Sequence, residues 1–306
     1  MYNGIEQYLE QLRAELAGSD PAMIQDALSD AEEHLRAAMA QMRTDRPELS
    51  EDDIVRVIAE EYGPPAEVAA AYREIEDRVR PALSPRPLRQ PLSDRPAAVD
   101  DRSLAARFFG VFIDPRAYAS LCYMFFSLIT GLLYFTWAMT GIFLSIGMIV
   151  LIVGLPFILV FLLSIQGVAL VEGRIVEALL GVRMPRRPLF SSPHLGFWER
   201  LKVLVTDKLS WTTLLYMIVQ LPLGIFYFTL FITMLALGLA GIAYPIASRF
   251  VDVPYVVFDS WRFYPPWWIH PILVAVGVLW IMVTLHLSRV VGRAHGAIAK
   301  ALLVRD

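Results

Sequence analysis

The feature that most limits what this chain can fold into is a long run without charged side chains, from residue 117 to residue 171. Its 55 residues contain no Asp, Glu, Lys or Arg. A membrane-spanning helix needs about 20 apolar residues, so this run is too long for one span and fits two spans joined by a turn. Two further uncharged runs, 209–248 and 272–288, predict a third and a fourth span. The pattern therefore predicts an all-α membrane region with four spans.

Within the first run, small residues near position 140 predict the turn, which gives spans at about 118–139 and 143–170. Gly154 and Pro156 then fall in the middle of the second span. In a membrane helix such residues predict a kink, at which the freed carbonyl finds another partner.

Charge is distributed unevenly along the chain, and this predicts both a second domain and an orientation. Residues 1–80 hold 19 acidic and 8 basic side chains, a net charge of −11, whereas the remainder carries a net charge of +8. Short basic loops stay on the cytoplasmic side of a membrane. We therefore expect a multi-pass protein of the cytoplasmic membrane with both termini in the cytoplasm. The basic residues that flank the spans are Arg102, Arg107, Arg116, Arg174, Arg183, Arg186, Arg187, Arg200, Lys202, Lys208, Arg289, Arg293, Lys300 and Arg305.

This orientation places the segment 249–271 outside, after a stretch at 235–248 that either prolongs the third span or folds back at the interface. Residues 253–258 are expected to form a short strand or hairpin arm, because the segment is rich in Val and Phe. Its aromatic residues are typical of an interfacial belt, and a ligand-sensing or envelope-stress-sensing element is the alternative. The candidate sensing residues are Asp259, Trp261, Arg262, Trp267 and Trp268.

The two halves of the membrane region look like copies of one another. Residues 123, 131, 134, 135, 140 and 144 recur at an offset of 93, and residues 173, 175 and 178–180 recur at an offset of 123. This predicts two parallel hairpin repeats, about 103–182 and 196–304, each preceded by an amphipathic interfacial helix. The outward segment 249–271 is then an insertion in the second repeat. The candidate core residues of the repeats are Gly131, Tyr134, Gly154, Pro156, Gly224 and Tyr227.

Residues 1–80 predict a small domain of four short helices, followed by a proline-rich linker at 81–101. Asp20 before Pro21 is a typical helix N-cap, and Ser50 with Asp53 resembles a capping box. Gly63 predicts a helix end and Pro65 the next helix start. The inward faces of the last two helices are expected to carry Ile54, Val57, Ile58, Val68, Ala71, Tyr72 and Ile75.

Two stretches of sequence resemble known families. The first stretch resembles the HAAS signalling domain. The resemblance rests on IEQYLEQLRAEL at the start, on DALSDAEEHLRAAM and on IVRVIAEEYGPPAEVAAAY. That resemblance implies a cytoplasmic helical module, often encoded beside PadR-type transcription regulators and fused to membrane sensors. The second stretch, residues 103–304, resembles a sensor domain of some actinobacterial membrane proteins and histidine kinases. The resemblance rests on the motifs LLYMIVQLPLGIFYFTLFITMLALGLAG and GLP.

No pattern of catalytic residues stands out, so we expect a protein that is not an enzyme and holds no cofactor or metal. The five histidines lack the HExxH spacing, and no P-loop, GxSxG or kinase motif is present. Cys122 is the only cysteine, which excludes an intrachain disulfide. Nucleic-acid binding is not expected either, because no recognition helix is evident.

The resulting hypothesis is a non-enzymatic signalling protein that couples a membrane or envelope signal to a cytoplasmic partner. A PadR-type regulator is the partner that the HAAS resemblance suggests, and Glu32, Glu33, Glu60 and Glu61 are the candidate binding residues. The bilayer and a second copy of the chain are further expected partners. A transporter and a scaffold subunit of a membrane complex remain alternatives, since parallel repeats also occur in transporters.

Overall fold

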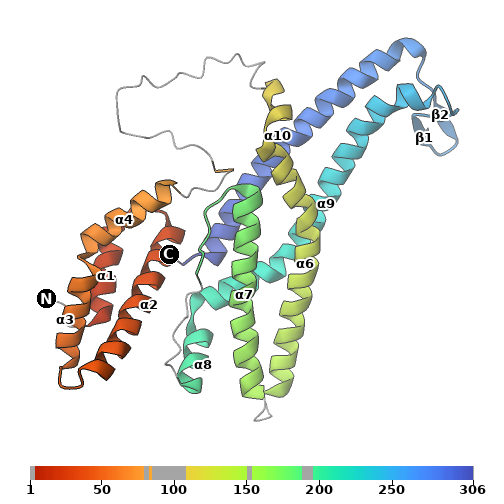
Figure 1. Cartoon of the computed structure of the whole chain (residues 1–306). Helices are drawn as coiled ribbons and strands as arrows, with labels where there is room; N and C mark the ends of the chain where they lie inside the picture. The colour runs from red at the N-terminus through yellow and green to blue at the C-terminus, as the bar shows by residue number, and fades with distance from the viewer. Residues whose placement is uncertain (1–3, 79–82, 85–107, 150–153, 188–195, 306) are drawn as a thin grey trace, which may run out of the picture. The chain divides into compact units, whose positions relative to one another are not determined.

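The structure is a computed structural model (Figure 1). Its described residues are 4–78, 83–84, 108–149, 154–187 and 196–305. The expected linker at 81–101 therefore lies outside the described residues except at positions 83–84.

The chain divides into two compact units. Unit 1 comprises 1–84, 136–218 and 296–306, and unit 2 comprises 85–135 and 219–295.

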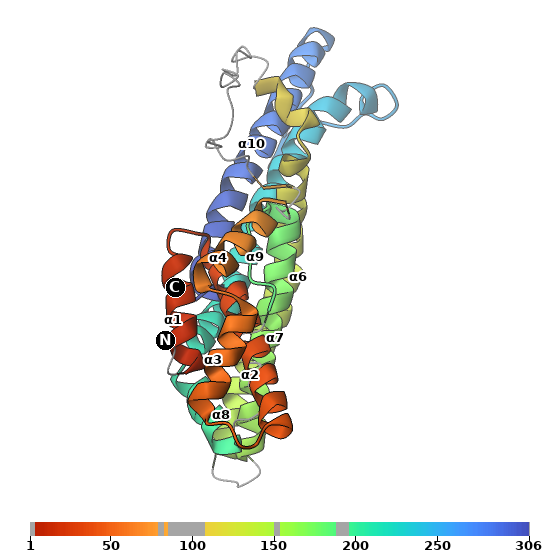
Figure 2. The same cartoon turned by 60° about the vertical axis from the view of Figure 1, so that its left-hand side comes forward.

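The first part of unit 1 is a four-helix bundle. Its helices are α1 (Ile5–Glu15), α2 (Pro21–Asp45), α3 (Glu51–Tyr62) and α4 (Pro65–Arg78), which pack side by side in Figures 1 and 2. Apolar residues at helical spacing turn one face of each helix inward, as expected for amphipathic helices. The large buried side chains are Tyr8, Leu12, Leu16, Met23, Leu35, Ile54 and Ile58.

The ends of these helices agree with the local sequence signals. The backbone N–H of Ala22 donates to the Asp20 carboxylate at 2.9 Å, and the N–H of Asp53 donates to the Ser50 hydroxyl oxygen at 3.2 Å. Gly63 ends α3 with φ +107°, a conformation that residues with a Cβ rarely adopt. The predicted caps are therefore confirmed.

Three positions of the expected inner faces are wrong. Val57 is 37% exposed, Ile75 is 55% exposed and Ala71 is exposed, whereas Val55 and Ala69 are buried. The buried face of α3 combines Ile54 and Ile58 with their next neighbours, Val55 and Ala59. A packed helix buries a stripe of neighbouring residues rather than a single row. The centre of the buried stripe predicted for α3 was misplaced by one residue.

Four long helices are apolar enough to cross a membrane, which confirms the predicted number of spans among the described residues. They are α6 (Pro115–Met148), α7 (Gly154–Leu180), α9 (Lys208–Ala247) and α10 (His270–Leu303, or Trp267–Leu303 with the short helix η2, Trp267–Ile269). The short helices η1 (Gly110–Ile113) and α8 (Phe197–Thr206) precede α6 and α9.

The turn between the first two spans is not near residue 140, as the sequence predicted. Helix α6 continues to Met148, and Gly154 begins α7, so Pro156 lies in the first turn, where its missing N–H costs nothing. Pro156 therefore does not kink the middle of a span. Gly141 is a packing residue instead, since an added Cβ would lie 1.9 Å from the Phe161 ring.

Helix α9 runs without interruption through 235–247, which settles the ambiguous stretch as a prolongation of the third span. The expected strand appears as β1 (Val256–Phe258), paired antiparallel with β2 (Trp261–Phe263). Asp259 in the connecting turn has φ +54°, a left-handed conformation that Asp tolerates better than most residues.

Residues 93 apart make matching contacts. A Cβ on Gly131 would lie 2.7 Å from the Gln220 carbonyl oxygen, and a Cβ on Gly224 would lie 2.5 Å from that of Ser127. Since Gln220 is 93 residues after Ser127, and Gly224 is 93 residues after Gly131, α6 and α9 approach each other reciprocally. Such self-complementary contacts are those that a two-fold relation between two copies produces.

Candidate functional site

The most heavily charged contact among the described residues lies in unit 1, where the segment after α7 meets the four-helix bundle. Helix α7 ends at Gly181, whose φ is +69°. A Cβ at this position would also lie 2.4 Å from the carbonyl oxygen of Leu83. Glycine is therefore required both by the positive φ and by the close approach of the Leu83 backbone. Beyond it, residues 182–187 run without helical structure and present three arginines; we call 183–187 the arginine segment.

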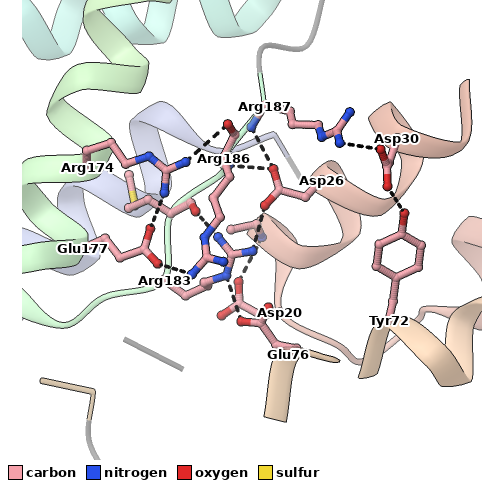
Figure 3. Close-up of polar contacts among 12 residues, drawn as sticks. Asp20, Asp26, Asp30, Tyr72, Glu76, Arg174, Glu177, Arg183, Arg186 and Arg187 are labelled. Atoms are coloured by element: carbon pink, nitrogen blue, oxygen red, sulfur yellow. Dashed lines mark hydrogen bonds and ion pairs between the residues drawn. The ribbon is translucent and has the colours of Figure 1, made fainter. Parts of the chain in front are cut away.

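Arg183 is the centre of this contact. Its guanidinium bridges two helices of the bundle, donating to Asp26 on α2 at 2.7 Å and to Glu76 on α4 at 2.8 Å (Figure 3). The Arg183 side chain is only 9% exposed. Burial on its own would lower the pKa of this guanidinium, but the hydrogen bonds to Glu76 and Asp26 outweigh burial and raise the pKa. Arg183 therefore remains a cation in a place that water hardly reaches.

Asp26 receives the segment's backbone as well. One carboxylate oxygen accepts the Arg183 side chain, and the other accepts the backbone N–H groups of Arg186 at 2.6 Å and Arg187 at 3.0 Å. Hydrogen bonds to a carboxylate are stronger than those between neutral groups. A single α2 residue thus fixes both the position and the direction of the arginine segment (Figure 3).

Arg187 extends the contact along α2. It pairs with Asp30 at 2.7 Å and with Glu33 at 2.9 Å. The second oxygen of Asp30 accepts the Tyr72 hydroxyl at 2.5 Å, and burial followed by this hydrogen bond raises the pKa of Tyr72. These ion pairs are more exposed than the Arg183 pairs, so each contributes little to stability.

The other side of the segment is held by α7. Arg186 pairs with Glu177 at 2.9 Å, and Arg174 pairs with the same carboxylate at 3.2 Å (Figure 3). The end of α10 adds a second point of contact with the bundle, where Lys300 pairs with Asp20 at 2.5 Å. The bundle is therefore bound to the ends of two membrane helices through charged groups.

The structure separates the four glutamates that the sequence singled out. Glu33 contacts Arg187, and Glu32 pairs within α2 with Arg36 at 2.8 Å. Glu60 and Glu61 are exposed on α3. The arginines were expected only to set orientation, and their docking on Asp26 was missed.

The candidate sensing residues of the segment 249–271 are exposed and lie in one hairpin and in the short helix that follows it. Asp259 lies in its turn, Trp261 and Arg262 lie on β2, and Trp267 and Trp268 lie in η2. Trp261 stacks on Phe263 with ring centroids 5.7 Å apart.

Two buried polar pairs in the membrane helices were also missed. In unit 2, the Tyr123 hydroxyl lies 2.7 Å from Nε2 of His295, and in unit 1 the Tyr216 hydroxyl donates to Glu172 at 2.7 Å. All four side chains are buried. The repeat offsets could have revealed them, because Tyr216 lies 93 residues after Tyr123 and His295 lies 123 residues after Glu172.

Four helices that are long and apolar enough to cross a bilayer define the class, a multi-pass membrane protein. A family model described as "Putative sensor" matches residues 123–303, which is more than half of the chain, and the chain belongs to this family. No curated protein and no solved structure matches the chain. The resemblance of residues 1–80 to the HAAS domain stays a prediction.

Proposed function

We propose that this protein is a non-enzymatic membrane sensor whose four-helix bundle is the cytoplasmic output module. The observation that supports this proposal is the docking of Arg183 between Asp26 and Glu76. The exposed ion pairs around Arg183 add little to the binding free energy, so the buried Arg183 pairs hold the bundle, and a change in the membrane helices that displaces Arg183 would release it. A large apolar contact would hold it more permanently.

The proposed orientation follows from the basic residues. Both termini and the arginine segment lie in the cytoplasm of a bacterial cell, and the hairpin β1–β2 faces outward. In this arrangement a signal received in the membrane or outside it reaches the bundle through the arginine segment that follows α7 and through the end of α10, both of which contact the bundle.

The proposed partner is a PadR-type transcription regulator that binds the acidic bundle. Glu60 and Glu61 are exposed on α3 in the docked state, whereas Glu33 is engaged by Arg187. Release of the arginine segment would therefore enlarge the acidic surface offered to a basic partner.

Hydrogen exchange of the full-length protein in nanodiscs tests the docking. Arg183→Gln should abolish the amide protection of residues 182–187, because Asp26 and Glu76 lose their shared cation. Arg43→Gln is the matched control, since Arg43 pairs with Glu51 on the exposed surface of the bundle. Equal protection in Arg183→Gln and the wild type would refute the docking.

Affinity capture from the source cells tests the partner. We expect the wild type to retain a small winged-helix regulator, and Glu60→Lys with Glu61→Lys to lose it. Glu10→Lys on α1, which is also exposed, is the control. If the full-length wild type retains no such regulator, the proposed partner is wrong.

Transport is the competing function, and one observation favours it. Glu172 and His295 are buried ionisable residues in membrane helices, and such residues often mark ion paths. Proton or cation flux through the protein in liposomes would support transport, and we expect none. Stoichiometric co-purification with an enzyme would instead support a scaffold.

A further inference from the structure

A cluster of four buried polar side chains lies in unit 2. It consists of Tyr123 on α6, Gln220 and Tyr227 on α9, and His295 on α10, and we call it the His295 cluster. Each of the four is buried, in helices that are otherwise almost wholly apolar. Ionisable residues at such places are costly and are retained where they serve a purpose.

The ring of His295 lies between two phenols. Its Nε2 is 2.7 Å from the Tyr123 hydroxyl, and its Nδ1 is 3.3 Å from the Tyr227 hydroxyl. A neutral imidazole has one donor and one acceptor. The shorter contact fits Tyr123 donating to Nε2, which leaves Nδ1–H to donate to the oxygen of Tyr227.

The cluster also contains an unused acceptor. The side-chain Nε2 of Gln220 lies 3.4 Å from the Tyr123 hydroxyl oxygen, to which it donates, while Gln220 Oε1 has no hydrogen-bond partner among the described residues. A buried carbonyl oxygen without a donor destabilises the fold, because it has lost its hydrogen bond to water. Such a group is expected where a second hydrogen-bond arrangement uses it.

We propose that His295 is a proton-binding site of the membrane domain, in which Tyr123, Tyr227 and Gln220 accommodate both protonation states of the ring. A proton taken from water forms Nε2–H, which then donates to the Tyr123 oxygen. The Tyr123 hydroxyl hydrogen turns away from the ring and donates to Gln220 Oε1. A half-turn of the Gln220 amide brings that oxygen to the place from which its nitrogen donated.

The described contacts of the His295 ring within unit 2 are with phenol groups. Among these contacts, Tyr123 on α6 and Tyr227 on α9 bring titratable groups against the ring. On α10 itself, the positions one turn away are Val291, Gly292, Ile298 and Ala299, none of which titrates.

The equivalent place in the first repeat is chemically different. Glu172 occupies the position of His295, Tyr216 that of Tyr123, and Ser127 that of Gln220. The Tyr216 hydroxyl donates to the Glu172 carboxylate at 2.7 Å. Each repeat thus places an ionisable group against the equivalent tyrosine of the other repeat, but the long amide with its unused acceptor stands only in the cluster around the histidine.

Solid-state NMR of the full-length protein in liposomes, with ¹⁵N-labelled histidine, tests the proposal. His295→Gln identifies its signal among those of the five histidines. We expect that signal to change from neutral imidazole to imidazolium at a midpoint between about pH 4 and pH 8, where histidines in proteins titrate. His286→Gln is the control, because His286 also lies on α10 but contacts the backbone of Phe108.

Two substitutions of Gln220 test the role of the unused acceptor. Gln220→Leu removes it and should move the midpoint to more acidic pH by about one unit or more, since one unit corresponds to a tenfold change in proton affinity. Gln220→Glu should move it the other way. Should His295→Gln fail to fold, Tyr123→Phe retains the histidine and should also lower the midpoint. A His295 signal that stays neutral until the protein unfolds, or a midpoint unchanged in Gln220→Leu, would overturn the proposal.

Discussion

The arginine segment and the His295 cluster are both polar, but they are built on opposite principles. The arginine segment gathers many charges, most of them half-exposed, around one buried guanidinium. The His295 cluster gathers few groups, all buried and linked by hydrogen bonds between uncharged partners. Water can replace a lost partner at the exposed ion pairs of the first, but hardly at its buried guanidinium or anywhere in the second.

This difference teaches which contacts can be reversible. The ion pairs near water are weak and adjustable, whereas the buried Arg183 pairs set the strength of docking. Buried polar groups in apolar helices must stay paired, so any change of protonation there has to rearrange the whole cluster. The predictions below break or sharpen this contrast, beginning with the largest expected effect.

Replacement of Arg183 should have the largest effect. Arg183→Ala leaves Asp26 and Glu76 facing each other without a cation, and removal of one partner of a buried ion pair costs about 3–5 kcal/mol. Docking of the bundle should therefore be lost, as seen in the hydrogen exchange of residues 182–187. Arg56→Ala, which removes an exposed pair with Asp53, should change that exchange by less than a factor of about three.

The reciprocal glycines should follow, because their backbones approach without room for a side chain. Gly131→Ala and Gly224→Ala place a methyl group 2.7 Å and 2.5 Å from carbonyl oxygens, and overpacking costs about 1–3 kcal/mol. Gly167→Ala is the control, since nothing lies within 4 Å of its added Cβ. In thermal unfolding in detergent, the two reciprocal variants should have similar melting temperatures, well below that of the control. A control with a melting temperature as low as either variant would contradict the reciprocal packing.

Local signals in the sequence were sufficient for the bundle and for the number of spans. Asp20, Ser50 and Gly63 act through neighbours within a few residues, so their roles could be predicted from the chain alone. The absence of charge over 55 residues likewise forces a membrane helix pair. The predicted position of the turn was wrong because Gly141 leaves room for the Phe161 ring on another helix, and no local pattern reveals such a contact.

The sites depended on long-range pairing, which explains why most of their residues were missed. Asp26 and Arg183 are 157 residues apart, and nothing near either residue distinguishes this pair from other charged residues. His295 is different, because the offsets of 93 and 123 already place Glu172 and Tyr216 at positions equivalent to His295 and Tyr123. Extending the repeat from apolar to polar positions would have found that site.

Loss of the buried hydrogen bond at Glu172 should have an intermediate effect. Tyr216→Phe removes the hydroxyl that donates to this buried carboxylate, and side-chain hydrogen bonds in membrane proteins contribute about 1 kcal/mol. Thermal unfolding should show a loss of about that size. Tyr118→Phe is the control and should lose less, because the Tyr118 hydroxyl donates to the Phe112 carbonyl oxygen at an exposed place, where water can replace it. A neutral Tyr216→Phe would show that Glu172 is satisfied by other groups.

Alkaline pH should destabilise the bundle through Tyr72. Burial and the hydrogen bond to Asp30 raise the pKa of the folded Tyr72, so the folded bundle keeps a proton that the unfolded chain loses. Its contribution is full below about pH 10, the ordinary pKa of tyrosine, and is lost as the pH rises further through the folded-state pKa. Circular dichroism of Tyr72→Phe should show a weaker loss of stability above pH 10 than the wild type shows.

Neutralising the exposed ion pair between Arg187 and Glu33 should have the smallest effect on docking. It tests most directly whether exposed and buried polar contacts differ in strength. Glu33 is exposed and shares Arg187 with Asp30, so Glu33→Gln should weaken docking by about 0.5 kcal/mol or less. Screening by salt acts on exposed charges, so 0.5 M salt should remove the difference between Glu33→Gln and the wild type, while the cost of Arg183→Ala persists because that contact is buried. If salt also abolished the difference between Arg183→Ala and the wild type, the Arg183 guanidinium would have to be accessible to ions. The contrast between the buried Arg183 pairs and the exposed Arg187 pairs would then be wrong.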